Sequence, residues 1–407
     1  MTNKEIINAA YKVWGKNFYM KTSLSSLAQE LGVSKPALYR HFENKQALTA
    51  AMTEHFLDDF ANFVRDDFQK ANTAKDADEG IFIIIQSVAG FFAADVYALI
   101  FSIVNISDRN LDGHSLMESL KSRNVDMGTL QRIINKKYIA EAAVVQMVYA
   151  SLTFFMSNFH KLENSVKKNP SEKKIREMIL AINKIIMSGL EFSAENAALD
   201  FKNLEEKIEK TELNSKPEPF FKAVAEAVAQ AGPWDVSMEM VAKRLGLSKS
   251  SLYGHFKNRK DMLRRLFFSE FGRIMEFARQ CIGMSDDPAQ QLYLGIFSIA
   301  VYLSSRPEIL ITMSWIRTRK LELGKPENDL EIFRLFEDVK IKQTQNSGEE
   351  NKQRISRWIL FLLINILMHP SLSEDSRKET SSPGNAQKTH IQLLYKFITL
   401  GLGGFIR

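Results

Sequence analysis

Apolar residues recur at helical spacing along most of the chain, and strand-like alternation is scarce. Near the N-terminus one such face consists of Leu24, Leu27, Ala28 and Leu31. Ser23 precedes it with a side chain suited to a helix N-cap, and Gly32 follows with the conformational freedom that a helix C-terminus requires. Ser34 then begins a shorter helix whose apolar positions are Leu38 and Phe42. The pattern predicts an all-α protein with two short helices joined by a tight turn near its N-terminus.

This two-helix segment occurs twice. Residues 31–42 return as residues 245–256, 214 positions later, with eight of the twelve residues identical. Repetition over such a distance predicts that the chain consists of two copies of one unit. Two helices across a glycine-containing turn are typical of a helix-turn-helix, whose second helix enters the major groove of DNA.

Helical patterning continues after each motif. In copy one it covers a long helix from Asn44 to about Gln69 and then residues 81–94, 96–106, 140–162 and 171–190. In copy two it covers residues 258–281, 288–304, 307–320, 330–342, 351–368 and 387–402. The residues between the copies are charged and then interrupted by Pro217 and Pro219, which indicates a linker. We therefore predict head one at residues 1–50, body one at 51–202, a linker at 203–218, head two at 219–264 and body two at 265–407.

Composition narrows the class of protein. A hydrophobic fraction of 45% and a charged fraction of 25% are ordinary for a soluble globular chain. The net charge of +6 is concentrated in the heads, since residues 5–50 carry +3 and residues 219–264 carry +4. Cys281 is the single cysteine, so no intramolecular disulfide forms, and the longest apolar run, residues 358–368, is too short to span a bilayer. These features predict a cytoplasmic protein.

Lys35 and Lys249 stand at the start of the second helix of each motif. The helix macrodipole disfavours a cation there by up to about 1 kcal/mol, so helix stability does not explain a lysine in both copies. A DNA phosphate or a guanine edge does explain it. A tolerated surface lysine is the alternative for either residue taken alone.

Both motifs, with their flanking residues, resemble the TetR family of transcriptional regulators. The resemblance is carried by residues 33–42 with Asn44, Lys45 and Leu48 in copy one and by residues 232–242 in copy two, and it extends over residues 5–55 and 219–269. It implies two tandem TetR-like units, each with a three-helix DNA-binding head and a helical body. It also implies double-stranded DNA as a partner.

The resemblance assigns site residues by position. It implies that bases are read by Lys35, Pro36, Ala37 and Tyr39 in head one, and by Lys249, Ser250, Ser251 and Tyr253 in head two. It implies phosphate contacts from Arg40, His41 and Lys45 in head one and from His255 and Arg259 in head two, and Ser34 and Ser248 complete the predicted DNA-binding set. Two departures separate the heads, because Gly254 replaces Arg40 and Phe18 stands where copy two has Gly232. We therefore expect head two to bind DNA more weakly than head one.

The last helices of each copy carry apolar faces, within residues 175–190 in copy one and within 355–366 and 391–402 in copy two. In the TetR family this helix pair forms a four-helix bundle between two subunits. Because both pairs lie on one chain here, we expect an intramolecular bundle and a monomer that acts as a covalent pseudo-dimer. The alternative is that each face packs only onto its own body.

A small apolar effector is the other partner that the resemblance implies. The candidate pocket residues are Phe82, Phe91, Phe101, Phe154 and Phe155 in copy one, and Phe297, Trp315 and Phe333 in copy two. An aromatic residue at helical spacing belongs more often to a core than to a pocket, and the sequence does not identify the ligand.

The sequence contains no catalytic constellation, no paired His or Cys at metal-ligand spacing and no nucleotide-binding loop. We therefore expect no enzyme activity, no cofactor and no metal site. The first function class is a sequence-specific transcriptional regulator, a repressor released by a small apolar ligand, that reads a two-half-site operator. The alternative is a protein-interaction module in which one or both heads no longer bind DNA, and Gly254 favours it for copy two.

Overall fold

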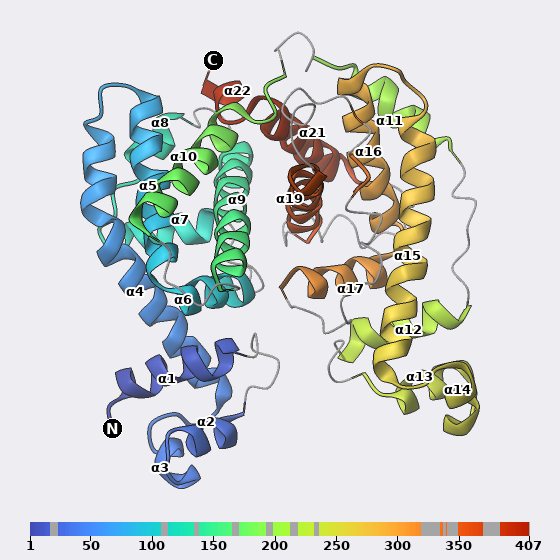
Figure 1. Ribbon diagram of the computed structural model, residues 1–407, viewed down its shortest axis with the longest axis horizontal. Coiled ribbons are helices and arrows are strands. Elements are labelled where there is room, and N and C mark those ends of the chain that lie inside the picture. Colours follow the sequence, from blue (N-terminus) through green and yellow to red (C-terminus); the bar gives the residue numbers. More distant parts are fainter. Residues whose placement is uncertain are drawn as a thin grey trace. The chain divides into compact units, whose positions relative to one another are not determined.

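The computed structural model describes most of the chain as helix (Figure 1). It describes residues 1–16, 23–106, 113–133, 138–164, 171–192, 198–211, 219–231, 236–318, 334–336, 339, 349–368 and 383–406. Every regular element within these ranges is a helix, as the sequence predicts. The chain divides into two compact units, Met1–Met187 with Phe405–Arg407, and Ser188–Gly404.

Head one is built from three short helices that enclose a small apolar core. They are α1 (Asn3–Lys16), α2 (Leu24–Glu30) and α3 (Lys35–Tyr39). The Ser23 and Ser34 hydroxyls accept hydrogen bonds from the backbone N–H groups of Ser26 and Ala37, at 3.0 and 3.3 Å, and so cap α2 and α3. Gly32 adopts a φ of +65°, the left-handed conformation that L side chains disfavour. The sequence predicts both caps and the turn correctly.

Body one follows along a long helix that leaves the head. Its helices are α4 (Lys45–Asn72), α5 (Ala77–Ala94), α6 (Val96–Phe101), the π-helix η1 (Ser102–Ile106), α7 (Gly113–Lys121), α8 (Gly128–Ile133), α9 (Tyr138–Asn164) and α10 (Glu172–Ser188). α5 is long and apolar enough to cross a membrane, but half of it is buried inside the structure. A core helix of a soluble protein has the same length and composition. The interior of the body is aromatic, with Phe56 and Phe60 of α4 against Phe91, Phe92 and Phe101.

Head two repeats the architecture of head one. Its helices are α12 (Pro219–Ala231), α13 (Met238–Leu245) and α14 (Lys249–His255). Ser237 and Ser248 cap α13 and α14 through the N–H groups of Met240 and Ser251, at 3.2 and 3.1 Å. Gly246 has a φ of +66°, as Gly32 has in head one. Equal caps and equal turns at positions 214 residues apart confirm the duplication.

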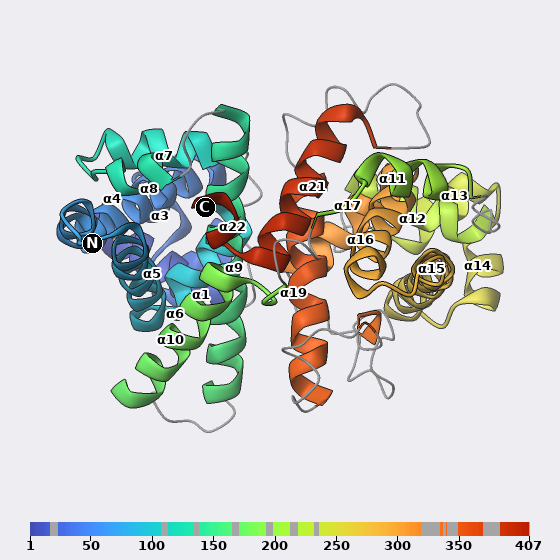
Figure 2. The same cartoon turned by 90° about the horizontal axis from the view of Figure 1, so that it is seen from above.

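Body two continues from head two along α15 (Arg259–Ile282), which runs beside α16 (Pro288–Ser304) in both views (Figure 1, Figure 2). The other described helices of body two are α11 (Phe201–Glu209), α17 (Pro307–Thr318), α19 (Glu349–Leu367) and α21 (Asn385–Leu400). The boundary between the two units falls within the last helix, α22 (Gly403–Ile406). The interior includes a buried charge: Glu270 of α15 accepts a 2.8 Å hydrogen bond from Tyr302 and forms a 3.3 Å ion pair with Arg273. The same position in copy one is Phe56, so the two bodies differ in the chemistry of their cores.

Residues 201–209 depart from the predicted linker at 203–218, because they form α11 within the second unit. Glu205 of α11 is 5% exposed and accepts hydrogen bonds from the Tyr293 hydroxyl at 2.6 Å and the Gln392 amide at 2.8 Å. Burial, with this hydrogen bond to Glu205, raises the pKa of Tyr293, so the phenol stays protonated and is the donor. The start of the predicted linker is therefore an integral part of body two, while residues 212–218 lie outside the described residues.

Candidate nucleic-acid interface

Head one presents α3 with an apolar side inward and a polar side to solvent. Leu38 and Phe42 are buried in the head core. Tyr39 is 44% exposed, which is unusual for a large ring and places it beyond the core. The other predicted contact residues that are exposed are Ser34, Lys35, Pro36, Arg40, His41 and Lys45. Ala37 is only half-buried, so its methyl group is less accessible than the other predicted base-reading side chains.

Two of these exposed residues also have local roles. The Ser34 hydroxyl caps α3 by accepting the backbone N–H of Ala37, so its first role is to hold the start of this helix in place. The His41 ring Nδ1 lies 2.8 Å from the Asn3 side-chain oxygen at the start of α1. This contact fixes the imidazole beside the end of α3, where a phosphate contact is predicted. Asn3 belongs to no motif, and no sequence pattern points to it.

Head two presents α14 in the same way. Leu252 and Phe256 are buried, and Tyr253 is 48% exposed at the position equivalent to Tyr39. The other predicted contact residues are all exposed, namely Ser248, Lys249, Ser250, Ser251, His255 and Arg259. The His255 ring packs on Phe220 of α12 with ring centroids 4.7 Å apart. Both heads therefore anchor the histidine against their first helix, by different contacts.

The surface of α14 differs from that of α3 in three ways. The Ser248 hydroxyl shares hydrogen bonds with the hydroxyls of Ser250 and Ser251, at 2.9 and 2.8 Å, where head one has Pro36 and Ala37. The helix continues through Gly254, and a Cβ built there meets no atom within 4 Å. The third difference is electrostatic and concerns Lys249.

Lys249 has a carboxylate neighbour that its counterpart lacks. Its Nζ lies 4.0 Å from Oε2 of Glu239 on α13, and both side chains are exposed. The residue equivalent to Glu239 in head one is Ser25. In the described part of head one, no ion pair involves Lys35. The two lysines share a predicted role but therefore differ in their electrostatic surroundings, since a carboxylate lies beside Lys249.

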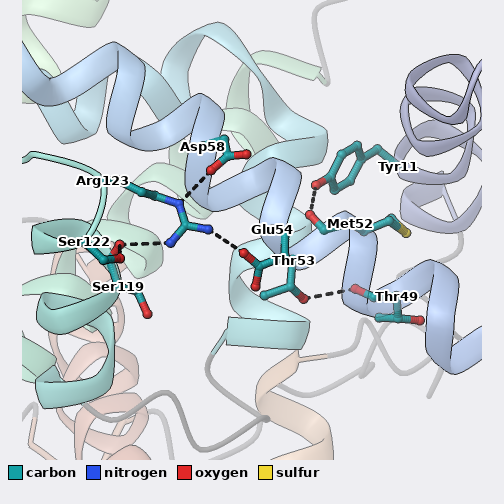
Figure 3. Close-up of polar contacts among 9 residues, drawn as sticks. All are labelled: Tyr11, Thr49, Met52, Thr53, Glu54, Asp58, Ser119, Ser122 and Arg123. Atoms are coloured by element: carbon teal, nitrogen blue, oxygen red, sulfur yellow. Dashed lines mark hydrogen bonds and ion pairs between the residues drawn. The ribbon is translucent and has the colours of Figure 1, made fainter.

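Head one is tied to its body through α1. In copy one, Tyr11 of α1 donates a hydrogen bond to the Met52 carbonyl of α4 (Figure 3) and packs edge-on against Phe101 of α6, with centroids 5.0 Å apart. A Cβ on Gly15 would lie 2.8 Å from the Tyr97 ring of α6, so that glycine permits the close approach of α1 and α6. These contacts join the head to the body interior.

Arg123, just after α7, binds the outer side of α4. Its Nε donates to Asp58 at 2.7 Å and its Nη2 donates to Glu54 at 2.5 Å (Figure 3). No sequence pattern signals this clamp, because helical periodicity marks the buried side of a helix and does not identify its polar partners. The clamp fixes the part of α4 that follows the head.

The predicted ligand-pocket residues fall into three groups. Phe91, Phe101 and Phe297 are buried and packed against other aromatic rings, as core residues are. Half-buried positions are taken by Phe82, Phe154 and Phe155. Trp315 lies on α17, but its side chain, like all of Phe333, lies outside the described residues. The pocket stays a prediction.

Comparison with known proteins agrees with the geometry of the heads. The family model described as "Bacterial regulatory proteins, tetR family" matches twice, at residues 6–52 and 221–266. The HTH-type transcriptional repressor ComR of Escherichia coli is 28% identical over 130 residues, which cover 31% of this chain and 61% of ComR. The chain therefore spans about three fifths of the length of that relative.

Two further proteins are similar to this chain. The fatty acid metabolism regulator protein of Bacillus subtilis is 25% identical over 154 residues, covering 36% of this chain and 78% of that protein. The solved structure of the fatty acid degradation regulator FadR from Bacillus halodurans covers 44% of this chain and 96% of its own, with 16% identity and a TM-score of 0.33.

Proposed function

Because the chain carries two TetR-type DNA-binding domains in tandem, we propose that it is a transcriptional regulator that reads DNA with two non-identical heads. The observation that carries the proposal is the outward presentation of α3 and α14. Each helix exposes a lysine at its start and a tyrosine four residues later, at equivalent positions. A lysine suits a guanine edge or a phosphate, and an exposed aromatic ring suits a thymine methyl group.

Repression is the mode that we propose. It is supported by the similarity to ComR, which is named a transcriptional repressor. A small apolar effector is the proposed signal, since the Bacillus subtilis relative is named for fatty acid metabolism and body one has an aromatic interior. The effector would bind in a body and act on a head through α1, α4 and α6, which the contacts of Tyr11 connect. We propose the cytoplasm as the site of action.

We further propose that one chain acts as a covalent pseudo-dimer, with the last helices of both copies forming an intramolecular bundle. Tethering gives the two copies an effective concentration on the order of millimolar, above the concentration of the protein itself. Light scattering at micromolar concentration should give the mass of one chain, 46.5 kDa. Twice that mass, persisting on dilution, would overturn this part of the proposal.

The function is tested by a gel shift with the DNA upstream of the protein's own gene. We expect a discrete complex whose affinity falls steeply with salt, because cations on both heads displace counterions from phosphates. The double variant Tyr39→Ala, Tyr253→Ala serves as the control and should lose the preference for this DNA over random sequence. Absence of any complex, or an affinity that salt does not change, would reject DNA binding and leave a protein-interaction module.

A further inference from the structure

The two heads differ in the number of cations at the start of the helix that follows the helix-turn-helix. Residues 256–265, at the start of α15, include five cations and one carboxylate, for a net charge of +4. The equivalent residues 42–51, at the start of α4, include one cation and one carboxylate, for a net charge of 0. Lys257, Lys260, Arg264 and Arg265 replace Glu43, Gln46, Ala50 and Ala51. All four cations are exposed.

Head one shows the opposite bias. Exposed Lys12 on α1 and exposed Arg40 after α3 are replaced in head two by Glu226 and Gly254. The net charges of the two heads are nevertheless similar, +3 for residues 5–50 and +4 for residues 219–264. The two heads therefore carry similar net charges at different positions, as expected of two surfaces that face the same polyanionic partner.

Internal contacts do not account for three of the cations in residues 256–265. Arg265 has a structural role, because it pairs with Asp261 at 3.3 Å and lies over the Phe256 ring, 5.6 Å from its centroid. Asp261 is the sole carboxylate of the segment, and it also accepts the backbone N–H of Lys257 at 3.0 Å. Within the described residues, no carboxylate lies within 4.0 Å of the side-chain nitrogens of Lys257, Lys260 or Arg264.

The position of these cations suits a duplex whose major groove holds α14. The first residue of α15 follows the last residue of α14 by only four positions, so the start of α15 lies next to the recognition helix. Lys260 and Arg264 are four residues apart and share one side of the helix. Arg264 lies over the exposed Phe268 ring at 5.4 Å, a contact that leaves its guanidinium in solvent.

We propose that Lys257, Lys260 and Arg264 form a phosphate-binding surface of head two, named here the α15 basic surface, which contacts the DNA backbone flanking its half-site. The inference rests on the proposed function and deepens it. It also revises the expectation that head two is the weaker head, because the α15 basic surface offsets the absence of an arginine at Gly254. Beyond the phosphate contacts at equivalent positions, head one adds cations on α1 and after α3, and head two adds them at the start of α15.

The test compares the salt dependence of DNA binding for two charge-matched variants. In the first, Lys257, Lys260 and Arg264 are replaced by glutamine. In the control, Lys173, Lys202 and Lys207, three exposed lysines outside the heads, are replaced by glutamine. Fluorescence anisotropy with a labelled random-sequence duplex is measured over a series of salt concentrations, and circular dichroism verifies that each variant is folded.

The slope of log affinity against log salt should flatten by about 0.9 for each phosphate contact removed, hence by about 2 to 3 in the first variant. The control should keep the wild-type slope. Equal slopes for both variants, with the wild type still binding DNA, would overturn the α15 basic surface and leave the proposed function intact. Failure of the wild type to bind any duplex would instead reject the proposed function.

A reciprocal variant tests the same inference without removing any contact. Glu43→Lys with Gln46→Lys gives head one the charges of head two at two exposed positions. It should steepen the salt slope by about 2. A slope that stays at the wild-type value would count against the proposal even if the glutamine variant of head two failed to fold.

Discussion

The Nζ of Lys249 lies 4.0 Å from the carboxylate of Glu239, on the side of head two that presents the recognition helix. Lys35, the equivalent of Lys249, has Ser25 at the position of Glu239. A carboxylate next to a predicted DNA-contacting lysine competes with DNA for the ammonium group and repels the phosphates. Head two therefore has a local restraint on binding that head one does not have.

Removing this carboxylate should tighten DNA binding. Glu239→Gln frees Lys249 and should raise affinity a few-fold at low salt, an effect of about 0.5–1 kcal/mol that salt screens. The variant should be slightly less stable, because Glu239 lies in the first turn of α13, where the helix dipole favours an acid. Anisotropy titrations and thermal unfolding measure the two effects. Weaker binding by the glutamine variant would contradict the competition.

The recognition tyrosines should differ in their contributions. Tyr39→Ala and Tyr253→Ala should each weaken specific binding by roughly 1–3 kcal/mol if the rings meet bases. Tyr39 should be the more important, because Glu239 competes with DNA for Lys249 on the helix that carries Tyr253. Neither substitution should alter stability much, since both rings project from the head cores. Phenylalanine at either position is the matched control and should keep most of the affinity. Unchanged affinity in both alanine variants would remove the rings from base reading.

Replacing Gly254 by arginine should strengthen DNA binding by head two. Gly254→Arg restores the cation of head one, and nothing within 4 Å obstructs its Cβ. The salt slope should steepen by about 0.9, and helix propensity should add about 1 kcal/mol to stability. Gly254→Ala separates the two effects, because it should gain stability and leave the slope unchanged. Identical slopes for the arginine and alanine variants would show that this position does not face a phosphate.

The helix caps and turns of the heads can be predicted from the sequence, because the contacts that form them join residues only a few positions apart. Ser23 and Ser34 cap their helices through backbone groups three residues away, and Gly32 turns the chain by its own conformation. The exposure of Tyr39 follows from its helical offset to Leu38 and Phe42. The outward presentation of the predicted DNA-contact residues therefore follows from residue spacing and capping alone.

The departures come from contacts between residues far apart in the sequence. Glu205 is 88 residues from Tyr293, and its burial turns a charged segment that resembles a linker into part of body two. Glu239 modifies Lys249 from another helix, and helical periodicity carries no information about such a pair. Arg123 clamps α4 from 65 residues away for the same reason. Periodicity predicts which side of a helix is buried and does not predict its polar partners.

The buried carboxylate of α15 should be necessary for the stability of body two. Glu270 is 1% exposed, and burial together with this neighbouring carboxylate raises the pKa of Tyr302, which donates to it. Glu270→Ala leaves the Arg273 charge and the Tyr302 hydroxyl without their acceptor and should lower the free energy of unfolding by about 3 kcal/mol. Glu270→Gln keeps a hydrogen-bond acceptor and should cost less. Urea unfolding measures both, and equal stability of the alanine variant and the wild type would contradict this role.

The central claim is that one chain reads DNA with two heads that differ, and selection of bound duplexes from a random pool tests it most directly. A homodimer has identical heads and tends towards a palindromic operator, whereas Pro36 and Ala37 of head one correspond here to Ser250 and Ser251 of head two at the base-reading positions. We predict two half-sites about one helical turn apart that share the bases read by Lys35 and Lys249 and diverge beside them. Recovery of a perfect palindrome, or of no enriched sequence at all, would contradict the account.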